Sequence, residues 1–185
     1  MSNAIGITVR KAEENDDPAA GKFFGAPTLP MKWVDTFDED EIFFCQIRLA
    51  DIAALDKEHR LPHTGYLYVF LRTEAGPYRL QADVRYYDGE PDTVVEGFNA
   101  ATDYARFAEA WLMKFAAAEE TDDGIKLFGV PADWSYAEDP PPLLMQYDPL
   151  ASKMGFLDHL DGYVYLFFGE DTADFSKVTL MVEYS

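Results

Sequence analysis

The sequence predicts an α+β, mainly β protein: an internally duplicated antiparallel roll with pseudo-twofold symmetry and one bridging helix. A short segment that begins at Gly65 recurs from Gly162, with its glycine, both tyrosines and its phenylalanine in place. Runs with strand-type alternation occur in both halves, and the clearest helix-type pattern lies between them. Because motifs that recur in a fixed order indicate repeated structural units, we expect a single domain, residues 1–185, built of two repeats at about 22–90 and 126–185.

The first repeat is expected to begin with an irregular segment. Residues 22–33 combine prolines and a glycine with large apolar side chains, and proline lacks the N–H that a helix interior or a central strand needs. We therefore expect a buried, irregular crossing, preceded by a solvated polar lead-in at residues 11–20. Residues 42–48 then form an apolar strand, and one or two turns of helix follow before Pro62.

Two further strands complete the first repeat. In residues 65–72 both alternating sets of side chains are apolar, which predicts a strand covered on both faces. Residues 79–87 alternate apolar with polar or charged side chains, so one face of that strand is expected to meet water. The Asp88-Gly89 pair supplies the turn that ends it.

Residues 102–120 show the strongest helical periodicity in the chain. Tyr104, Phe107, Trp111 and Phe115 fall at the spacing that gives one broad apolar stripe. A helix at this place would bridge the two repeats. Beyond it, the second repeat is expected to run through a similar irregular segment and three further strands.

Six motifs follow one another in matching order: FFGAPTLP, FFCQIRLADI and TGYLYVF in the first half, and LFGVPADW, PPLLMQYD and DGYVYLFF in the second. Together they resemble the YwqG-like family of bacterial domains of unknown function, over residues 22–185. The resemblance implies a mainly β, internally duplicated roll with flanking helices, and it implies no established activity. Arg48 departs from the small polar residue expected at its place, whereas Asp148 fits the pattern.

The chain is strongly acidic, with 15 Lys and Arg against 34 Asp and Glu and a formal net charge of −19. Such a field repels phosphate backbones and anionic lipid, so neither nucleic acid nor a membrane is expected as a partner, whereas a basic protein or peptide is compatible. The single cysteine, Cys45, lies in an apolar run, and no segment has the length of a signal peptide or a membrane span. We expect a cytoplasmic protein of open oligomeric state.

Two glutamines are the most informative polar residues. Gln46 and Gln146 each lie in an apolar strand, where an unpartnered amide costs about 1–3 kcal/mol. Either each side chain bonds the backbone of the other repeat, or the two amides line a shared cleft. Arg48 and Asp148 follow two residues later on the same strand faces, so a twofold arrangement would bring them together as an ion pair.

Aromatic residues supply the other candidates for ligand binding. Trp33 and Trp134 follow the two Gly-X-Pro turns, and Tyr66 and Tyr163 open the two recurring strands. We expect the tryptophans to present exposed ends as anchors in a groove between the repeats, because tryptophan is frequent at binding hot spots. The tyrosines either pack in the core or line a platform for a ligand.

Catalytic and metal-binding patterns are weak in this sequence. Pro62 interrupts the only close histidine pair, and the acidic loop at residues 35–41 lacks the glycine turn and distal glutamate of an EF-hand. We therefore expect no metal, no cofactor and no catalytic residue, and favour a non-catalytic binding or protein-interaction module. The alternative is a small-molecule-binding or hydrolase-like enzyme that uses Asp35, Asp133 or Asp148 in the groove.

Overall fold

The computed structural model describes residues 3–73, 80–100, 106–136, 138–150, 154–155 and 162–183. Within these residues the main sheet contains β1 (Ala4–Lys11), β2 (Lys22–Phe23), β4 (Ile42–Arg48), β5 (Tyr66–Thr73), β6 (Leu80–Tyr87), β8 (Trp111–Ala118), β9 (Lys126–Leu127), β10 (Leu143–Tyr147), β11 (Val164–Phe167) and β12 (Thr179–Val182). A second, small sheet pairs β3 (Thr28–Leu29) with β7 (Thr93–Val94). Short 3-10 helices are η1 (Met31–Trp33), η2 (Leu49–Asp51) and η4 (Phe175–Lys177).

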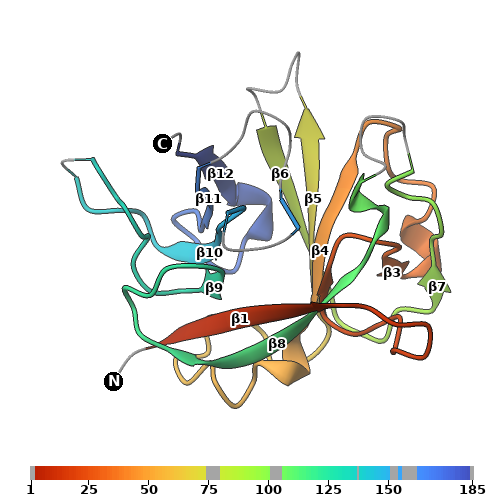
Figure 1. Ribbon diagram of the computed structural model, residues 1–185, viewed down its shortest axis with the longest axis horizontal. Coiled ribbons are helices and arrows are strands. Elements are labelled where there is room, and N and C mark those ends of the chain that lie inside the picture. Colours follow the sequence, from red (N-terminus) through yellow and green to blue (C-terminus); the bar gives the residue numbers. More distant parts are fainter. Residues whose placement is uncertain are drawn as a thin grey trace.

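β1 and β8 form the centre of the main sheet. They pair antiparallel along their whole length, from Ala4 opposite Ala118 to Lys11 opposite Trp111. Beyond β1 the order continues through β9, β10, β11 and β12, and beyond β8 through β2, β4, β5 and β6. Figure 1 shows the β1–β8 pair crossing the base of the molecule between these two groups. The outer strands β6 and β12 contact each other, so the sheet is nearly closed and barrel-like.

The bridging helix expected at residues 102–120 is absent from the described residues, so the prediction of an α+β fold is wrong. Residues 106–108 form a single 3-10 turn, and β8 occupies Trp111–Ala118. The start of the expected helix, at residues 101–105, lies outside the described residues. The described chain is almost entirely β in its regular structure, with no α-helix at all.

A second periodicity explains why residues 111–118 form a strand. Trp111, Met113 and Phe115 pack against the core, whereas Lys114 between them is exposed. This is an alternation of period two, and it coexists in the sequence with the helical stripe. Pairing with β1 decides between the two patterns, because the strand obtains backbone hydrogen bonds from both neighbours in the sheet.

β1 was not expected, since the ordered fold was predicted to begin at residue 22. Ile5 and Ile7 are buried in the main core, while Thr8 and Arg10 are exposed. The segment is therefore an amphipathic strand at the middle of the sheet, and the ordered fold begins before residue 22. Only its pairing with β8 and β9 reveals this central position.

The strands predicted from apolar alternation are confirmed at β4 and β5. β4 has the predicted bounds, and β5 is buried on both faces as expected. Leu67, Val69 and Leu71 belong to the main core cluster, and the alternate side chains, including Tyr68 and Phe70, belong to a separate cluster on the other face. The sheet is thus covered on both sides at this strand.

Matching tight turns follow β2 and β9. Phe24 and Phe128 have φ values of 54° and 62°, and the next residues, Gly25 and Gly129, have φ values of 75° and 82°. Two successive residues in the left-handed region reverse the chain sharply. The halves therefore share turn geometry and strand order, and the two-repeat organisation of the chain stays a prediction.

Candidate functional site

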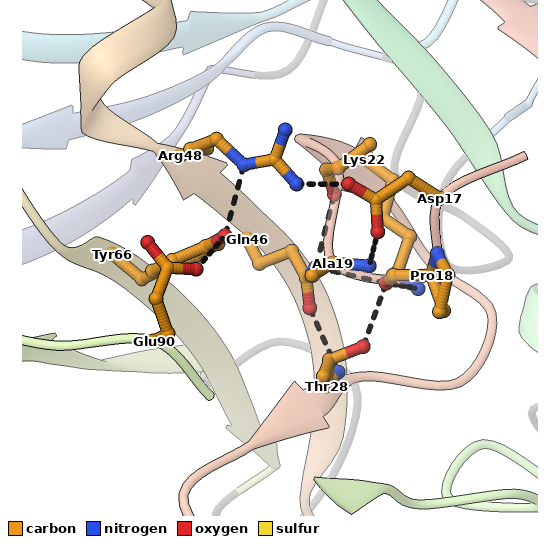
Figure 2. A network of polar contacts seen from close by, with 10 residues as sticks. Asp17, Pro18, Ala19, Lys22, Thr28, Gln46, Arg48, Tyr66 and Glu90 are labelled. Atoms are coloured by element: carbon orange, nitrogen blue, oxygen red, sulfur yellow. Dashed lines mark hydrogen bonds and ion pairs between the residues drawn. The ribbon is translucent and has the colours of Figure 1, made fainter. Parts of the chain in front are cut away.

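Gln46 is completely buried in β4, and its amide is bonded to backbone groups (Figure 2). Its Oε1 accepts a hydrogen bond from Thr28 N at 2.9 Å, and its Nε2 donates to Ala20 O at 2.9 Å and to Pro18 O at 3.3 Å. Tyr68 Oη donates to Thr28 O at 2.7 Å, so both backbone groups of Thr28 are bonded to side chains of the sheet. This arrangement attaches the loop before β2 and the strand β3 to β4.

Gln146 makes the equivalent bonds in β10 and is also completely buried. Its Oε1 accepts from Ala132 N at 2.7 Å, and its Nε2 donates to Gly124 O at 2.9 Å. Tyr165 Oη donates to Ala132 O, as Tyr68 does in the first half. The predicted burial and bonding of both glutamines are confirmed.

The glutamines do not join the two halves, which corrects one of the two alternatives. Each amide bonds backbone that lies in its own half of the chain, residues 18–28 for Gln46 and residues 124–132 for Gln146. Since these bonds use the oxygen and the nitrogen of each amide, each side chain stabilises the packing of its own half.

Arg48 and Tyr66 lie next to each other on paired strands and belong to an ionic network (Figure 2). Arg48 Nε donates to Tyr66 Oη at 2.9 Å, and its Nη2 forms an ion pair with Asp17. Tyr66 Oη donates in turn to Glu90 Oε2 at 3.1 Å. The hydrogen bond from Arg48 lowers the pKa of the Asp17 carboxyl, and burial raises the pKa of the Tyr66 hydroxyl. The network joins the loop before β2, the strands β4 and β5, and the segment after β6.

Asp148 does not form the expected ion pair with Arg48, whose acidic partner is Asp17. Its Oδ1 instead accepts a hydrogen bond from Leu150 N at 2.8 Å. Burial, followed by the charges of Asp148, Asp123 and Asp133, raises the pKa of Tyr163 to about 12. Asp148 and Tyr163 thus interact within the second half, whereas Arg48 and Tyr66 interact within the first.

Trp33 and Trp134 are half-buried rather than presented as exposed anchors. The Trp33 ring makes edge contacts with Tyr68 and Tyr87, at centroid distances of 5.6 and 5.7 Å. The Trp134 ring packs against Phe167 at 5.6 Å, and its Nε1 donates to a backbone oxygen at 2.8 Å. Both indoles cover aromatic clusters on the face of the sheet opposite the main core.

The carboxylates of the enzymatic alternative do not form one group. Asp35 and Asp133 are exposed, in segments that follow β3 and β9 respectively, and Asp148 lies half-buried beyond β10. The charges of Asp133 and Asp148 both raise the pKa of Tyr163, whereas Asp35 lies in the other half. Within the described residues, histidine, cysteine and carboxylate side chains form no group of three or more suited to a metal ion.

Cys45 packs in the core, and His59 and His63 stack on each other. Cys45 is fully buried in β4, and desolvation raises the pKa of its thiol. The rings of His59 and His63 stack at a centroid distance of 4.3 Å, and His63 Nε2 lies 3.4 Å from Asp56 Oδ2. His159 lies outside the described residues.

A cavity of about 680 Å³ lies beside the central strands β1 and β8. It is lined by residues 6–9 of β1, by Trp111 and residues 116–118 of β8, by residues 122–125 and by Lys126 of β9. Glycine and alanine at positions 6, 116–118 and 124 leave the space open. None of the eight binding residues predicted from the sequence lines it, and no residue of the first repeat does, so the groove between the two repeats stays a prediction.

Two buried lysines occupy matching places beside the sheet centre. Lys126 is paired with Gly6 and Gln146, and Lys22 with Leu112 and Gln46. Lys126 lines the large cavity, and its Nζ donates to two backbone oxygens, Glu120 O at 2.8 Å and Asp122 O at 2.5 Å. Burial lowers its pKa.

The sequence contained a signal for these lysines. Each one opens a repeated motif, KFFGAP at residues 22–27 and KLFGVP at residues 126–131. The prediction of a buried crossing depended on the aromatic, glycine and proline residues that follow each lysine. Because lysine is a side chain that is almost never fully buried unless it is paired, its type alone argues against a place in the core.

β1 offers an unpaired backbone edge beside the large cavity. It pairs with β9 at Ile5 and Gly6, and Ile7 N donates to Ile125 O at 2.8 Å. Because backbone groups alternate in direction along a strand, the N–H and C=O of Val9 point to the same side as those of Ile7. No described strand pairs with β1 on that side at Val9.

No protein-family model and no curated protein matches this chain. Among the described residues, no helix has the length and apolar character needed to cross a membrane.

Proposed function

We propose that this protein is a non-catalytic binding module that takes an extended, basic peptide segment in the cavity beside β1 and β8. One observation carries the proposal: a cavity of about 680 Å³, lined in part by glycine and alanine, lies directly beside the open edge of β1. An extended peptide can pair its main chain with Val9, as peptides do when they add a strand to a sheet edge. Its alternate side chains then enter the space over Gly6 and Ala116.

The negative charge of the cavity lining favours a basic ligand. Asp122 and Asp123 line the cavity and are exposed, and the carboxylate of Asp123 has no hydrogen-bond partner among the described residues. The one lysine in the lining, Lys126, is buried and donates to the backbone of its own loop. A ligand therefore meets net negative charge at the mouth, within the field of a chain of charge −19.

The family resemblance and the location enter this proposal as expectations. The YwqG-like motifs assign no activity, which suits a binding module as well as any other role. A single buried Cys45 makes no internal disulfide, and we propose a cytoplasmic protein on that ground. The oligomeric state stays open.

The test is a titration with two short peptides, one that alternates lysine with valine and one that alternates glutamate with valine. Trp111 lines the cavity, so its fluorescence reports occupation. We expect the lysine peptide to bind and its affinity to fall at high ionic strength, because salt screens the attraction between exposed charges. Equal binding of the two peptides, or no binding of either, contradicts the proposal.

Three variants locate the peptide. Ala116→Leu fills the cavity from an exposed position, and Val9→Pro removes one N–H from the open edge without touching the β8 pairing. Asp123→Lys reverses one charge at the cavity, and Asp35→Lys makes the same change at an exposed site in another segment. We expect the first three to weaken binding at least about 10-fold, a change of about 1.4 kcal/mol, and Asp35→Lys to have a much smaller effect.

A further inference from the structure

Lys22 lines a second cavity, of about 200 Å³, on the other side of the central strand pair. The residue is only 4% exposed, yet the cavity connects its side chain with Ala12, Asp17 and Glu96. Figure 2 shows the side chain reaching the loop before β2, where Nζ donates to Pro18 O at 2.7 Å.

The amino group of Lys22 is poorly satisfied as an ammonium. An ammonium has three N–H donors, and in the described residues Nζ has one acceptor and no ion pair. Burial lowers the pKa of Lys22 to about 8, against the opposing charges of Glu96 and Asp17. Lys126, its counterpart, donates to two backbone oxygens and is completely buried. Of these two buried lysines, only Lys22 combines a single hydrogen-bond acceptor among the described residues with a place in the lining of the smaller cavity.

We propose that Lys22 is a nucleophilic amine that forms a reversible imine with a small, uncharged aldehyde or ketone bound in this cavity. The lone pair of Nζ attacks the carbonyl carbon and gives a carbinolamine. Loss of the hydroxyl with the remaining N–H proton, as one water molecule, forms the C=N bond, and hydrolysis reverses both steps. Carboxylates of Glu13, Glu14 and Glu96 line the same cavity, so an anionic carbonyl compound is disfavoured.

The test compares the reaction rates of individual lysines in the wild-type protein. The native protein is treated with propionaldehyde and cyanoborohydride at about pH 7.5, where the lowered pKa gives Lys22 about a 200-fold larger neutral fraction than an ordinary lysine. Mass spectrometry after cleavage at aromatic residues then locates each adduct. We expect Lys22 to react at least about 10-fold faster than the exposed Lys114, while Lys126 stays unmodified.

Three controls keep the result specific. In denaturant the three lysines should react at similar rates, because the difference depends on the folded environment. Glyoxylate, an anionic aldehyde, should label Lys22 more slowly than propionaldehyde does. Lys22→Arg should remove that adduct and leave the rate at Lys114 unchanged. Labelling of Lys22 at or below the rate of Lys114 overturns the proposal. That result would not bear on the proposed peptide binding, because the cavity beside β1 is lined by other residues.

Discussion

At the residue scale, the two buried glutamines stabilise the fold through defined hydrogen-bond partners. Replacing Gln46 by alanine leaves the N–H of Thr28 and the C=O of Ala20 without their partner in a buried place. We expect both Gln46→Ala and Gln146→Ala to lower the free energy of unfolding by about 1–3 kcal/mol each in urea denaturation. Gln81→Ala, at an exposed position of β6, is the control and should stay within about 0.5 kcal/mol. Wild-type stability of both core variants contradicts this role.

The lowered pKa of Lys22 predicts a pH effect on stability. Its pKa is about 8 in the folded protein and 10.5 in the unfolded chain, so between these values the unfolded state binds more protons. Stability therefore rises with pH in this window, by at most about 1.4 kcal/mol per pH unit from this group. Urea denaturation of wild type and Lys22→Met between pH 8 and 9.5 measures the difference.

The free energies of unfolding of the wild type and of Lys22→Met should diverge as the pH rises. The wild type should gain stability relative to Lys22→Met across the window, because only the wild type loses the penalty of a buried charge. The comparison with Lys114→Met, at an exposed lysine, removes general effects of a lost positive charge. Parallel pH profiles for Lys22→Met and wild type would show that Lys22 titrates like a lysine in water.

At the element scale, the paired turns after β2 and β9 are the strongest constraints on the chain. A Cβ at Gly25 would lie 2.5 Å from Ala110 Cβ, and a Cβ at Gly129 would lie 2.6 Å from Glu120 O. Both glycines also have positive φ values. We expect Gly25→Ala and Gly129→Ala each to cost more than about 2 kcal/mol, since steric overlap adds to the backbone penalty.

Gly124→Ala separates these two contributions. Gly124 has a φ of 85°, but a Cβ there meets no atom within 4 Å. Its substitution should therefore cost only the backbone penalty, about 1–2 kcal/mol. Thermal unfolding of the three variants tests the order, and equal losses in all three would mean that the close contacts at Gly25 and Gly129 relax freely.

Among the elements, β5 was predicted correctly and β8 was not, and their sequence patterns explain the difference. β5 has apolar side chains on both faces, and no competing pattern exists in its sequence. Residues 111–118 satisfy a helical and a strand pattern together, and local preference cannot choose between them. β1 supplies the choice from a distant part of the chain, through its register with β8.

At the scale of the whole molecule, the excess of carboxylates should oppose folding. A net charge of −19 repels itself more strongly in the compact state than in the extended chain. We therefore expect the midpoint of thermal unfolding to rise when sodium chloride is added at low concentration, because the Debye length shortens from about 30 Å at 0.01 M to about 10 Å at 0.1 M.

Choline chloride at the same ionic strength is the control for this prediction. Both salts screen charge equally, whereas they differ as cations that bind carboxylates. An equal rise in both salts supports general repulsion. A rise in sodium chloride alone points to bound cations, and an unchanged midpoint in both contradicts the prediction.

The sequence by itself determined the apolar strands, the irregular crossings at the Gly-X-Pro motifs and the burial of Gln46 and Gln146, because each depends on residue preferences within a few positions. The tertiary structure alone decided that residues 111–118 are a strand, that β1 is central, and that a cavity lies beside β1 and β8. It also decided that Lys22 is buried with a single acceptor among the described residues. These features depend on which distant segments pair, and pairing depends on the packing of the complete sheet rather than on local sequence.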